Sequence, residues 1–448
     1  MQFRLRDYFS PLQVFAHHRR MREAPFWSPE RLDAWSRPRR KGLIAHAYTH
    51  VPYYRRLLDE HGIYPTRVDR DEVWRRIPLL TKDILREHAG DLTAMSQFSR
   101  RAVWAGTSGS TAAPLRFLLD RRVNAAAFAL FWRAWSSGGH WRLGQRQAAL
   151  KGLNHPDGWR YHRAIQTLEM SSGRLDPGTA RLYRDLLERY RPRFLRGYPS
   201  SMYLFCRLLR DEGLEAHVPM VISGSEMLHD FQRAMIESVL RTRVYNHYTH
   251  WERAASILEC DAGRMHAQED YAHHEILDRD GEPVPPGVPG EITTTGLYNL
   301  AMPLVRYRTG DIARWTTERC PCGQAFPAVE GIEGRQNDYL VSQCGGLLIP
   351  STYAVTGFKA FSELLYIQII QRDLEGVEVR IVKGPGYRDP QDTHRVREEL
   401  HIRLGREMRL DIRFCTTGEL ERNPVGKIRS CYNRLPAELI ERCGIPAV

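Results

Sequence analysis

The chain has 448 residues, of which 42% are hydrophobic and 26% charged, and its formal net charge is +12. A chain of this length is expected to hold about two or three domains with full-sized cores, which excludes a lone binding module. Because both fractions are close to those of ordinary globular proteins, long disordered and fibrous architectures are excluded as well.

The first hundred residues are expected to form helices rich in arginine and aromatic residues, with apolar positions at helical spacing over 28–36 and 55–61. Arginines interrupt the apolar positions of residues 1–22, so this stretch does not predict a signal peptide. The apolar stretch 125–135 is interrupted by Arg133 and is shorter than the roughly 20 residues that span a bilayer. We expect no transmembrane segment. The low density of cysteines indicates reduced thiols or metal ligands, and hence a cytoplasmic location.

A short strand at 103–104 leads into a loop of small residues that can wrap an anion. Hydroxyls and exposed backbone N–H groups can hold a polyphosphate, and glycine permits close backbone approach. A serine- and threonine-rich turn without a ligand is the alternative. The candidate ligands in this loop are Thr107, Ser108, Gly109, Ser110 and Thr111.

The middle of the chain alternates helices and strands in the manner of an α/β fold. We expect helices over 181–189, 200–210 and 229–240, and strands over 194–195, 218–222 and 243–245. Loops that leave such strands commonly bind ligands. Beyond residue 275 the pattern changes to short strands. After a boundary near 334–338, the tail predicts strands over 377–382 and 409–414 and a helix over 394–405.

Four residues of two separate segments have the spacing of a metal site. Cys320 and Cys322 lie in one tight turn, and Cys260 precedes His266 by six positions. Two such pairs could complete a tetrahedral zinc site, and free thiols are the alternative. The adjacent histidines His273 and His274 are expected to be a pair on a strand surface.

The basic pI of about 9.4 raises the alternative of an arginine-rich nucleic-acid-binding protein. The chain has only six lysines, and its many arginines are scattered along the sequence. Scattered arginine indicates biased residue usage rather than a binding face. We therefore expect no nucleic-acid partner.

Several motifs occur in an order that resembles the adenylate-forming superfamily of acyl-CoA synthetases, adenylation domains and luciferases. Residues 195–201, the Glu259-Cys260 pair and residues 301–307 resemble the phenylacetate-CoA ligase branch most, with CapK-like proteins the closest look-alikes. The order-defining motifs are 107–114, Tyr248-Thr249-His250-Trp251-Glu252, Tyr307-Arg308-Thr309-Gly310-Asp311, 334–338 and Asn423-Pro424-Val425-Gly426-Lys427-Ile428.

The resemblance implies a role for each matching residue. Lys427, one of only six lysines, matches the catalytic lysine, whose ammonium lowers the barrier to carboxylate attack on the α-phosphate. Glu252 matches the Mg²⁺-binding carboxylate. Asp311 matches the ribose-binding carboxylate, and Tyr248 the aromatic residue that stacks on the purine. The remaining implied residues are Thr107, Ser108, Gly109, Ser110 and Thr111 for phosphates, Gly224, Ser225, Glu226, Thr249 and Arg335 for the nucleotide, and Tyr198, Ser223 and His250 for the substrate pocket.

The resemblance also implies the reaction and the domains. It implies an ATP-dependent ligase that forms acyl-AMP and pyrophosphate from a small carboxylic acid and passes the acyl group to CoA. An amine or a carrier protein is the alternative acceptor. The implied fold is an α/β adenylation domain over 1–336, helical over 1–100 and with a β-rich subdomain, and a small mobile α+β domain over 337–448. Because the cysteine segments recur in this branch, structural zinc is favoured over free thiols.

Overall fold

The fold was taken from a computed structural model of the chain. It describes residues 11–100, 102–106, 115–136, 141–151, 155–172, 175–335, 339–341, 348–350, 361, 363–422, 428, 430–436 and 438–439, without the side chains of 231, 333–335, 339 and 348–350. These residues form two compact units. One combines Met1–Leu143 with Tyr245–Glu333, and the other combines Gly144–Val244 with Gly334–Val448.

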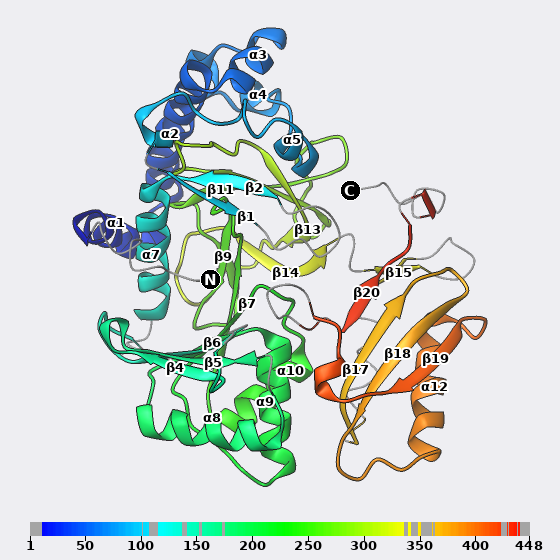
Figure 1. The fold of residues 1–448 in the computed structure, drawn as a ribbon. Helices are drawn as coiled ribbons and strands as arrows, with labels where there is room; N and C mark the ends of the chain where they lie inside the picture. The colour runs from blue at the N-terminus through cyan, green and yellow to red at the C-terminus, as the bar shows by residue number, and fades with distance from the viewer. Residues whose placement is uncertain are drawn as a thin grey trace. The chain divides into compact units, whose positions relative to one another are not determined.

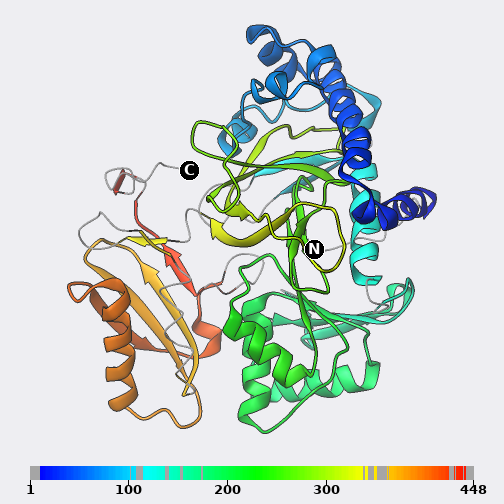
Figure 2. The same ribbon diagram turned by 180° about the vertical axis from the view of Figure 1, so that it is seen from behind.

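Helices begin the first unit, drawn in blue in Figures 1 and 2. The long helix α2 starts where the Ser28 hydroxyl accepts the N–H of Arg31 at 3.3 Å, and Pro29 takes the first turn. It ends at Val51, directly before Pro52. The helices of this unit are α1 (Pro11–Glu23), α2 (Pro29–His50), α3 (Pro52–Glu60), α4 (Asp71–Arg75), α5 (Lys82–Glu87), α6 (Gln97–Arg100) and α7 (Arg121–Ser136).

Antiparallel strands form the rest of the first unit. They are ordered β11-β12-β13-β14-β10-β9-β8, and a separate pair, β1 with β2, flanks residues 107–114. Apolar residues such as Ile257, Ile276 and Val329 form a core within this sheet. The strands are β1 (Val103–Gly106), β2 (Arg116–Leu119), β8 (Val244–Thr249), β9 (Ser256–Glu259), β10 (Met265–Ala267), β11 (Ala272–Leu277), β12 (Gly290–Gly296), β13 (Tyr307–Trp315) and β14 (Ala328–Arg335).

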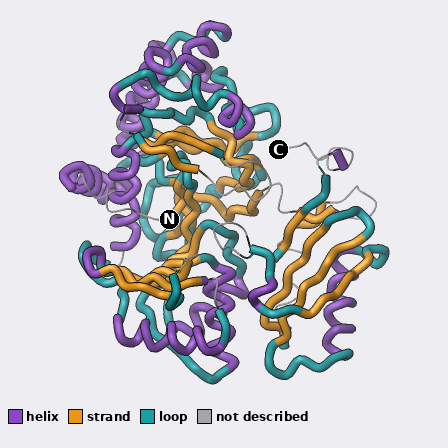
Figure 3. Tube along the Cα trace, viewed as in Figure 1, coloured by secondary structure: helices purple, strands orange, loops and turns teal. Residues whose placement is uncertain are grey.

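A mostly parallel sheet begins the second unit, in the order β7-β6-β3-β5-β4, with β4 antiparallel at the edge. One face of this sheet packs against helices α8 and α9 through apolar residues such as Leu150 of β3, Met170 of β5 and Leu195 of β6. Figure 3 shows these helices beside the strands. The elements are β3 (Gln147–Lys151), β4 (Trp159–His162), β5 (Thr167–Ser171), α8 (Pro177–Tyr190), β6 (Leu195–Gly197), α9 (Pro199–Asp211), β7 (Val221–Gly224) and α10 (Asp230–Leu240).

The C-terminal part of the second unit is a four-stranded sheet, ordered β19-β18-β17-β20, with α12 along one face (Figure 1). Val396 and Leu400 of α12 pack on Val377 and Val379 of β18. The elements are β15 (Tyr339–Val341), β16 (Leu348–Pro350), β17 (Leu364–Gln371), β18 (Gly376–Lys383), α12 (Gln391–Leu404), β19 (Arg409–Phe414) and β20 (Cys431–Asn433).

The predicted α/β fold is confirmed, and the predicted elements overlap observed ones, with bounds that differ by a few residues in most cases. The strand expected over 218–222 begins later, at Val221, and Pro219 has no N–H to donate to a ladder. Strands β3 and β5 and helix α7 were not predicted. The domain boundary expected at residue 336 stays a prediction.

Candidate active site

Three of the predicted site residues meet in one hydrogen-bonded group. Tyr248, in β8, donates its hydroxyl to Oδ2 of Asp311, in β13, at 2.8 Å. His250 Nε2 lies 2.6 Å from the same hydroxyl and 3.2 Å from Asp311 Oδ2. Nε2–H therefore donates to both oxygens, since the tyrosine proton is already used by the carboxylate. This group binds the end of β8 to the middle of β13.

The second ring nitrogen of His250, Nδ1, remains available for a ligand. Its side chain is buried, and within the part of the chain that the structure describes, Nδ1 makes no hydrogen bond. A buried, unsatisfied ring nitrogen costs free energy unless a ligand or water satisfies it. This atom therefore fits a polar group of a substrate.

Glu252 lies in the turn after β8 and is also buried. Its Oε1 accepts a hydrogen bond from the hydroxyl of Tyr307, the first residue of β13, at 3.1 Å. The described residues offer this carboxylate no ion pair with a lysine, arginine or histidine. A buried carboxylate without a cation is costly, so its oxygen atoms fit a hard divalent ion such as Mg²⁺.

The loop after β7 carries the residues expected along the nucleotide. Glu226 accepts the N–H of Ser200 at 3.1 Å, at the start of helix α9, where the helix dipole favours negative charge. Burial, with a smaller effect of Glu226, raises the pKa of Tyr198 to about 12, so this phenol keeps its proton at neutral pH. Ser225 adopts a φ of +69°, and the buried Ser223 hydroxyl has no hydrogen-bond partner among the described residues.

Gly224 and Thr249 are the last residues of β7 and β8. Other predicted nucleotide and catalytic residues lie outside the described part of the chain. They are the loop residues Thr107, Ser108, Gly109, Ser110 and Thr111, the side chain of Arg335, and Lys427. Their roles stay predictions. What the structure does describe is the pairing of β1 with β2, in which Gly106 lies opposite Arg116 at the two ends of the loop.

The four proposed metal ligands come together, as the sequence spacing predicted. One ligand atom from each of Cys260, His266, Cys320 and Cys322 lies within 4.8 Å of the others. The sulfur atoms of Cys260 and Cys320 are 3.5 Å apart, which is too far for a disulfide. His266 Nδ1 lies 2.9 Å from the carbonyl of Phe326, which fixes its proton there and leaves the Nε2 lone pair for a metal.

Comparison with known proteins supplies the family context for this geometry. Residues 340–434 match the CapK C-terminal domain. The phenylacetate-coenzyme A ligase of Thermus thermophilus is 28% identical over 432 residues, covering 89% of this chain and 96% of that protein. Protein CapK of Staphylococcus aureus is 23% identical over 370 residues, covering 80% of each chain. The chain is thus similar to phenylacetate-CoA ligases and to CapK over most of its length.

A solved structure has the same fold as this chain. The crystal structure of 2-hydroxyisobutyryl-CoA ligase in the postadenylation state, in complex with R3-HIB-AMP, matches with a TM-score of 0.73 at 19% identity. The match covers 94% of this chain and 93% of that chain. The predicted resemblance to phenylacetate-CoA ligases and CapK-like proteins is confirmed by the sequence matches, and the chain has the fold of an acyl-CoA ligase.

Two features of this protein differ from what the sequence analysis predicted. His274 is buried, so the expected surface pair with His273 is wrong: His274 Nδ1 lies 3.0 Å from Glu269, and its Nε2 accepts the N–H of Ser256. Tyr307, which holds Glu252, was not assigned a role. Its place in the same motif as Asp311 was the available signal. The described residues contain no helix long and apolar enough to cross a membrane.

Proposed function

We propose that this protein is an AMP-forming ligase that activates a small carboxylic acid with ATP and transfers the acyl group to CoA. A carboxylate oxygen attacks the α-phosphorus of ATP and pyrophosphate leaves. The CoA sulfur then attacks the acyl carbon and AMP leaves. The observation that carries the proposal is the Thermus relative, named phenylacetate-coenzyme A ligase, which aligns over 89% of this chain.

The nucleotide roles rest on the buried groups of β8 and β13. Asp311 would accept hydrogen bonds from the two ribose hydroxyls, which replace or join those from Tyr248 and His250. The ring of Tyr248 would lie against the purine. Glu252 would hold Mg²⁺, which neutralises phosphate charge when bound.

The roles of the other predicted residues are part of the same proposal. Lys427 would stabilise the charge that develops on the α-phosphate, and the loop from Thr107 to Thr111 would hold the phosphates. Gly224, Ser225 and Glu226 would line the adenine, with Thr249 and Arg335 also on the nucleotide.

The acid would meet polar groups as well as aromatic ones. In the second unit, Tyr198 offers a protonated hydroxyl, and the buried Ser223 hydroxyl has no partner among the described residues. In the first unit, His250 Nδ1 is likewise unsatisfied among the described residues. Each would be a hydrogen-bonding group for the acid. The expectation of a cytoplasmic enzyme without a nucleic-acid partner stays a prediction.

An amine or a carrier-protein thiol is the second candidate acceptor. The match of residues 340–434 to the CapK C-terminal domain supports this alternative, because that range includes Lys427 and most of the small mobile domain expected over 337–448. All three nucleophiles attack the same acyl-AMP, so adenylation is common to both candidates.

We also propose a structural zinc ion bound by Cys260, His266, Cys320 and Cys322. Two or more thiolates with one imidazole in a compact group form a donor set that zinc prefers. The hydrogen bond from His266 to Phe326 supports the proposal, because such a bond orients a ligating imidazole.

A pyrophosphate-release screen tests the function. Purified protein is supplied with MgATP and aryl, aliphatic, hydroxy, amino and uronic acids, each with and without CoA. Pyrophosphate release that depends on one acid, and a thioester formed only with CoA, are expected. Release without any thioester, followed by product formation with an amine, would favour the second candidate. The Lys427→Ala variant is the control, with adenylation expected to fall by roughly 10²-fold or more.

A further inference from the structure

Two glutamines on strand β17 are buried completely, and each holds the backbone of another segment. Gln368 donates Nε2–H to the carbonyl of Glu421 at 3.0 Å and accepts the N–H of Glu421 at 2.8 Å. Gln371 forms the same pair of bonds with Val341, both at 2.7 Å. Each side-chain amide thus satisfies both the N–H and the C=O of one residue, as the backbone of a neighbouring β-strand would.

The segment held by Gln368 leads directly to the proposed catalytic lysine. Arg422 and Ile428 form an antiparallel bridge, so the two ends of the intervening stretch, which carries Lys427, are paired. Ile428 and Leu420 are buried in the apolar core of their unit. Gln368 therefore acts on the residue next to this bridge.

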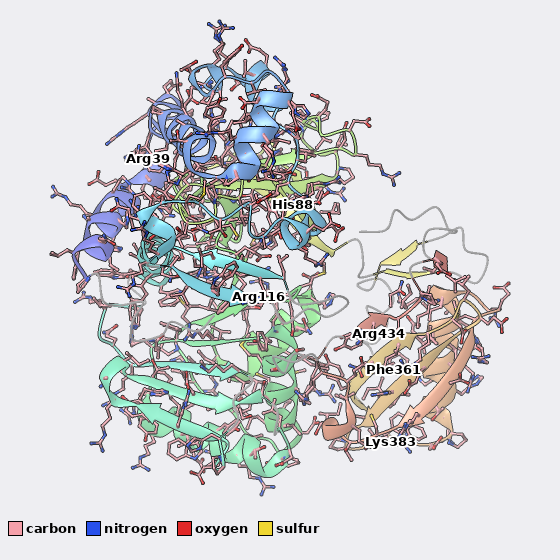
Figure 4. The ribbon with its side chains drawn as sticks, turned by 45° about the horizontal axis from the view of Figure 1, so that its top comes forward. Arg39, His88, Arg116, Phe361, Lys383 and Arg434 are labelled. Carbon is pink, nitrogen blue, oxygen red and sulfur yellow. The ribbon has the colours of Figure 1, made fainter. Side chains whose placement is uncertain are left out.

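Further groups of the same sheet converge on Glu421. The hydroxyl of Tyr432, in β20, donates to the Glu421 carbonyl at 3.1 Å, so that oxygen accepts two hydrogen bonds. The carboxylate of Glu421 accepts from Arg434, labelled in Figure 4. The peptide group of Glu421 is thereby held at its N–H and its carbonyl at once.

The segment held by Gln371 has another place in the chain. Val341 ends β15, a few residues after the predicted domain boundary near 334–338, and is far in sequence from Lys427. The two glutamines share residue type, strand, burial and bonding pattern, and differ in the segment that each one holds. They form a matched pair for an experiment.

We propose that Gln368 is a positioning residue for adenylation, because it fixes Glu421, next to the bridge between Arg422 and Ile428, and Lys427 directly precedes Ile428 in the sequence. The inference rests on the proposed function. Gln368 touches neither nucleotide nor acid in this role, and its effect passes through Glu421. A displacement of about 1 Å in a catalytic group can cost roughly 10²-fold in rate, so the loss of the two buried hydrogen bonds to Glu421 is expected to lower the rate of turnover measurably.

The test compares Gln368→Met with Gln371→Met. Methionine keeps the length and burial of glutamine without its donor and acceptor. Two half-reactions are timed in each variant: acid-dependent pyrophosphate release, and thioester formation from supplied acyl-AMP and CoA. For Gln368→Met we expect kcat of the first step to fall about 10- to 100-fold, with KM for ATP and the second step within about threefold of wild type. Gln371→Met is expected to keep the first step within about threefold.

Three results would overturn the positioning role: an unchanged first step in Gln368→Met, equal loss of both half-reactions, or the same loss in both variants. Tyr432→Phe is the second variant if Gln368→Met does not fold. It removes one hydrogen bond to Glu421 and is expected to lower the first step about threefold with an unchanged melting temperature, and a wild-type rate would count against the role.

Amide hydrogen exchange separates this proposal from the proposed function. Gln368→Met is expected to exchange faster than Gln371→Met at residues 421–422 and 428. If the wild-type protein releases no pyrophosphate with any acid, the proposed function fails. The exchange result then still decides whether Gln368 holds the segment, and unchanged protection at these residues refutes it.

Discussion

Replacing Arg306 with methionine is expected to destabilise the first unit strongly, because this guanidinium is buried and holds four separate groups. Only 2% of Arg306 is exposed. It donates to the carbonyls of Ile77 at 2.9 Å and Gly281 at 3.1 Å, and also to that of Arg75. It lies 3.2 Å from the carboxylate of Glu275. One side chain thereby ties the N-terminal helical region to β11 and to the start of β13.

The magnitude follows from what methionine would leave behind. Glu275 would keep one hydrogen bond, from the indole N–H of Trp74 at 3.2 Å, and no ion pair. Breaking a buried ion pair on one side costs about 3–5 kcal/mol, and each orphaned carbonyl about 1–3 kcal/mol, not additively. For a loss of about 5 kcal/mol in a unit of this size, the melting temperature is expected to fall about 10–20 °C.

Thermal unfolding of Arg306→Met and of two control variants measures this fall in melting temperature. Arg308→Met, at a β13 arginine whose side chain is 31% exposed and which pairs with Glu291 of the neighbouring strand β12, is expected to lose about 1 kcal/mol. The double variant Arg306→Met with Glu275→Met removes the stranded carboxylate and is expected to recover part of the loss. If Arg306→Met melts within about 2 °C of wild type, the reasoning is refuted.

Four further predictions concern the site, the metal, the hinge and pH. Asp311→Ala is expected to weaken ATP and AMP binding alike by about 10- to 100-fold, whereas Glu252→Gln should slow MgATP turnover and spare AMP affinity, as calorimetry and pyrophosphate release can show. Freshly purified protein is expected to hold about one zinc per chain and the Cys322→Ser variant much less; metal-free wild type would contradict the site. We expect the small C-terminal domain to pivot between the two half-reactions about a few residues around Asn337, in the predicted boundary. Asn337→Pro is therefore expected to slow acyl transfer while sparing pyrophosphate release, because proline fixes φ near about −65°, and a wild-type rate of transfer would place the hinge elsewhere. Burial raises the pKa of Glu269, but the hydrogen bonds from His273 and His274 outweigh burial and hold the pKa at about 2. The ionised Glu269 therefore stabilises the protein above about pH 4.5, and this stabilisation is lost as the pH falls toward 2. Glu269→Gln is expected to reduce the dependence of the melting temperature on pH in this range.

Local signals in the sequence were sufficient for many of the elements. The helix over 200–210 and the strand over 409–414 agree with α9 and β19, because amphipathic spacing and flanking turn residues act within a few positions. Strands β3 and β5 were missed. They pair in parallel with each other, and β3 also pairs with β6, which follows helix α8, and a short apolar run does not reveal such partners.

In the candidate site, too, local sequence patterns predicted some features, and others depended on the tertiary structure. The motifs identified Tyr248, Asp311 and Glu252 by residue type and order, and the spacing of Cys260 and His266 predicted a half-site for a metal. The bonds among Tyr248, His250 and Asp311, and the donor role of Tyr307, depend on which strands become neighbours. Buried partners such as Gln368 carried no signal in the sequence, because a glutamine in an apolar strand has no motif.

The sequence by itself thus determined the chemistry available to this protein: its ordered motifs, its rare lysine and its paired cysteines are local patterns that a homologous family shares. Only the tertiary structure decided which groups satisfy one another. His274 is buried because Glu269 and the Ser256 N–H bind its two ring nitrogens, and Arg306 is buried because four acceptors from three segments surround it. Such contacts join residues tens to hundreds of positions apart, and burial makes each of them necessary, since an unpaired polar group in the interior costs more than it does in water.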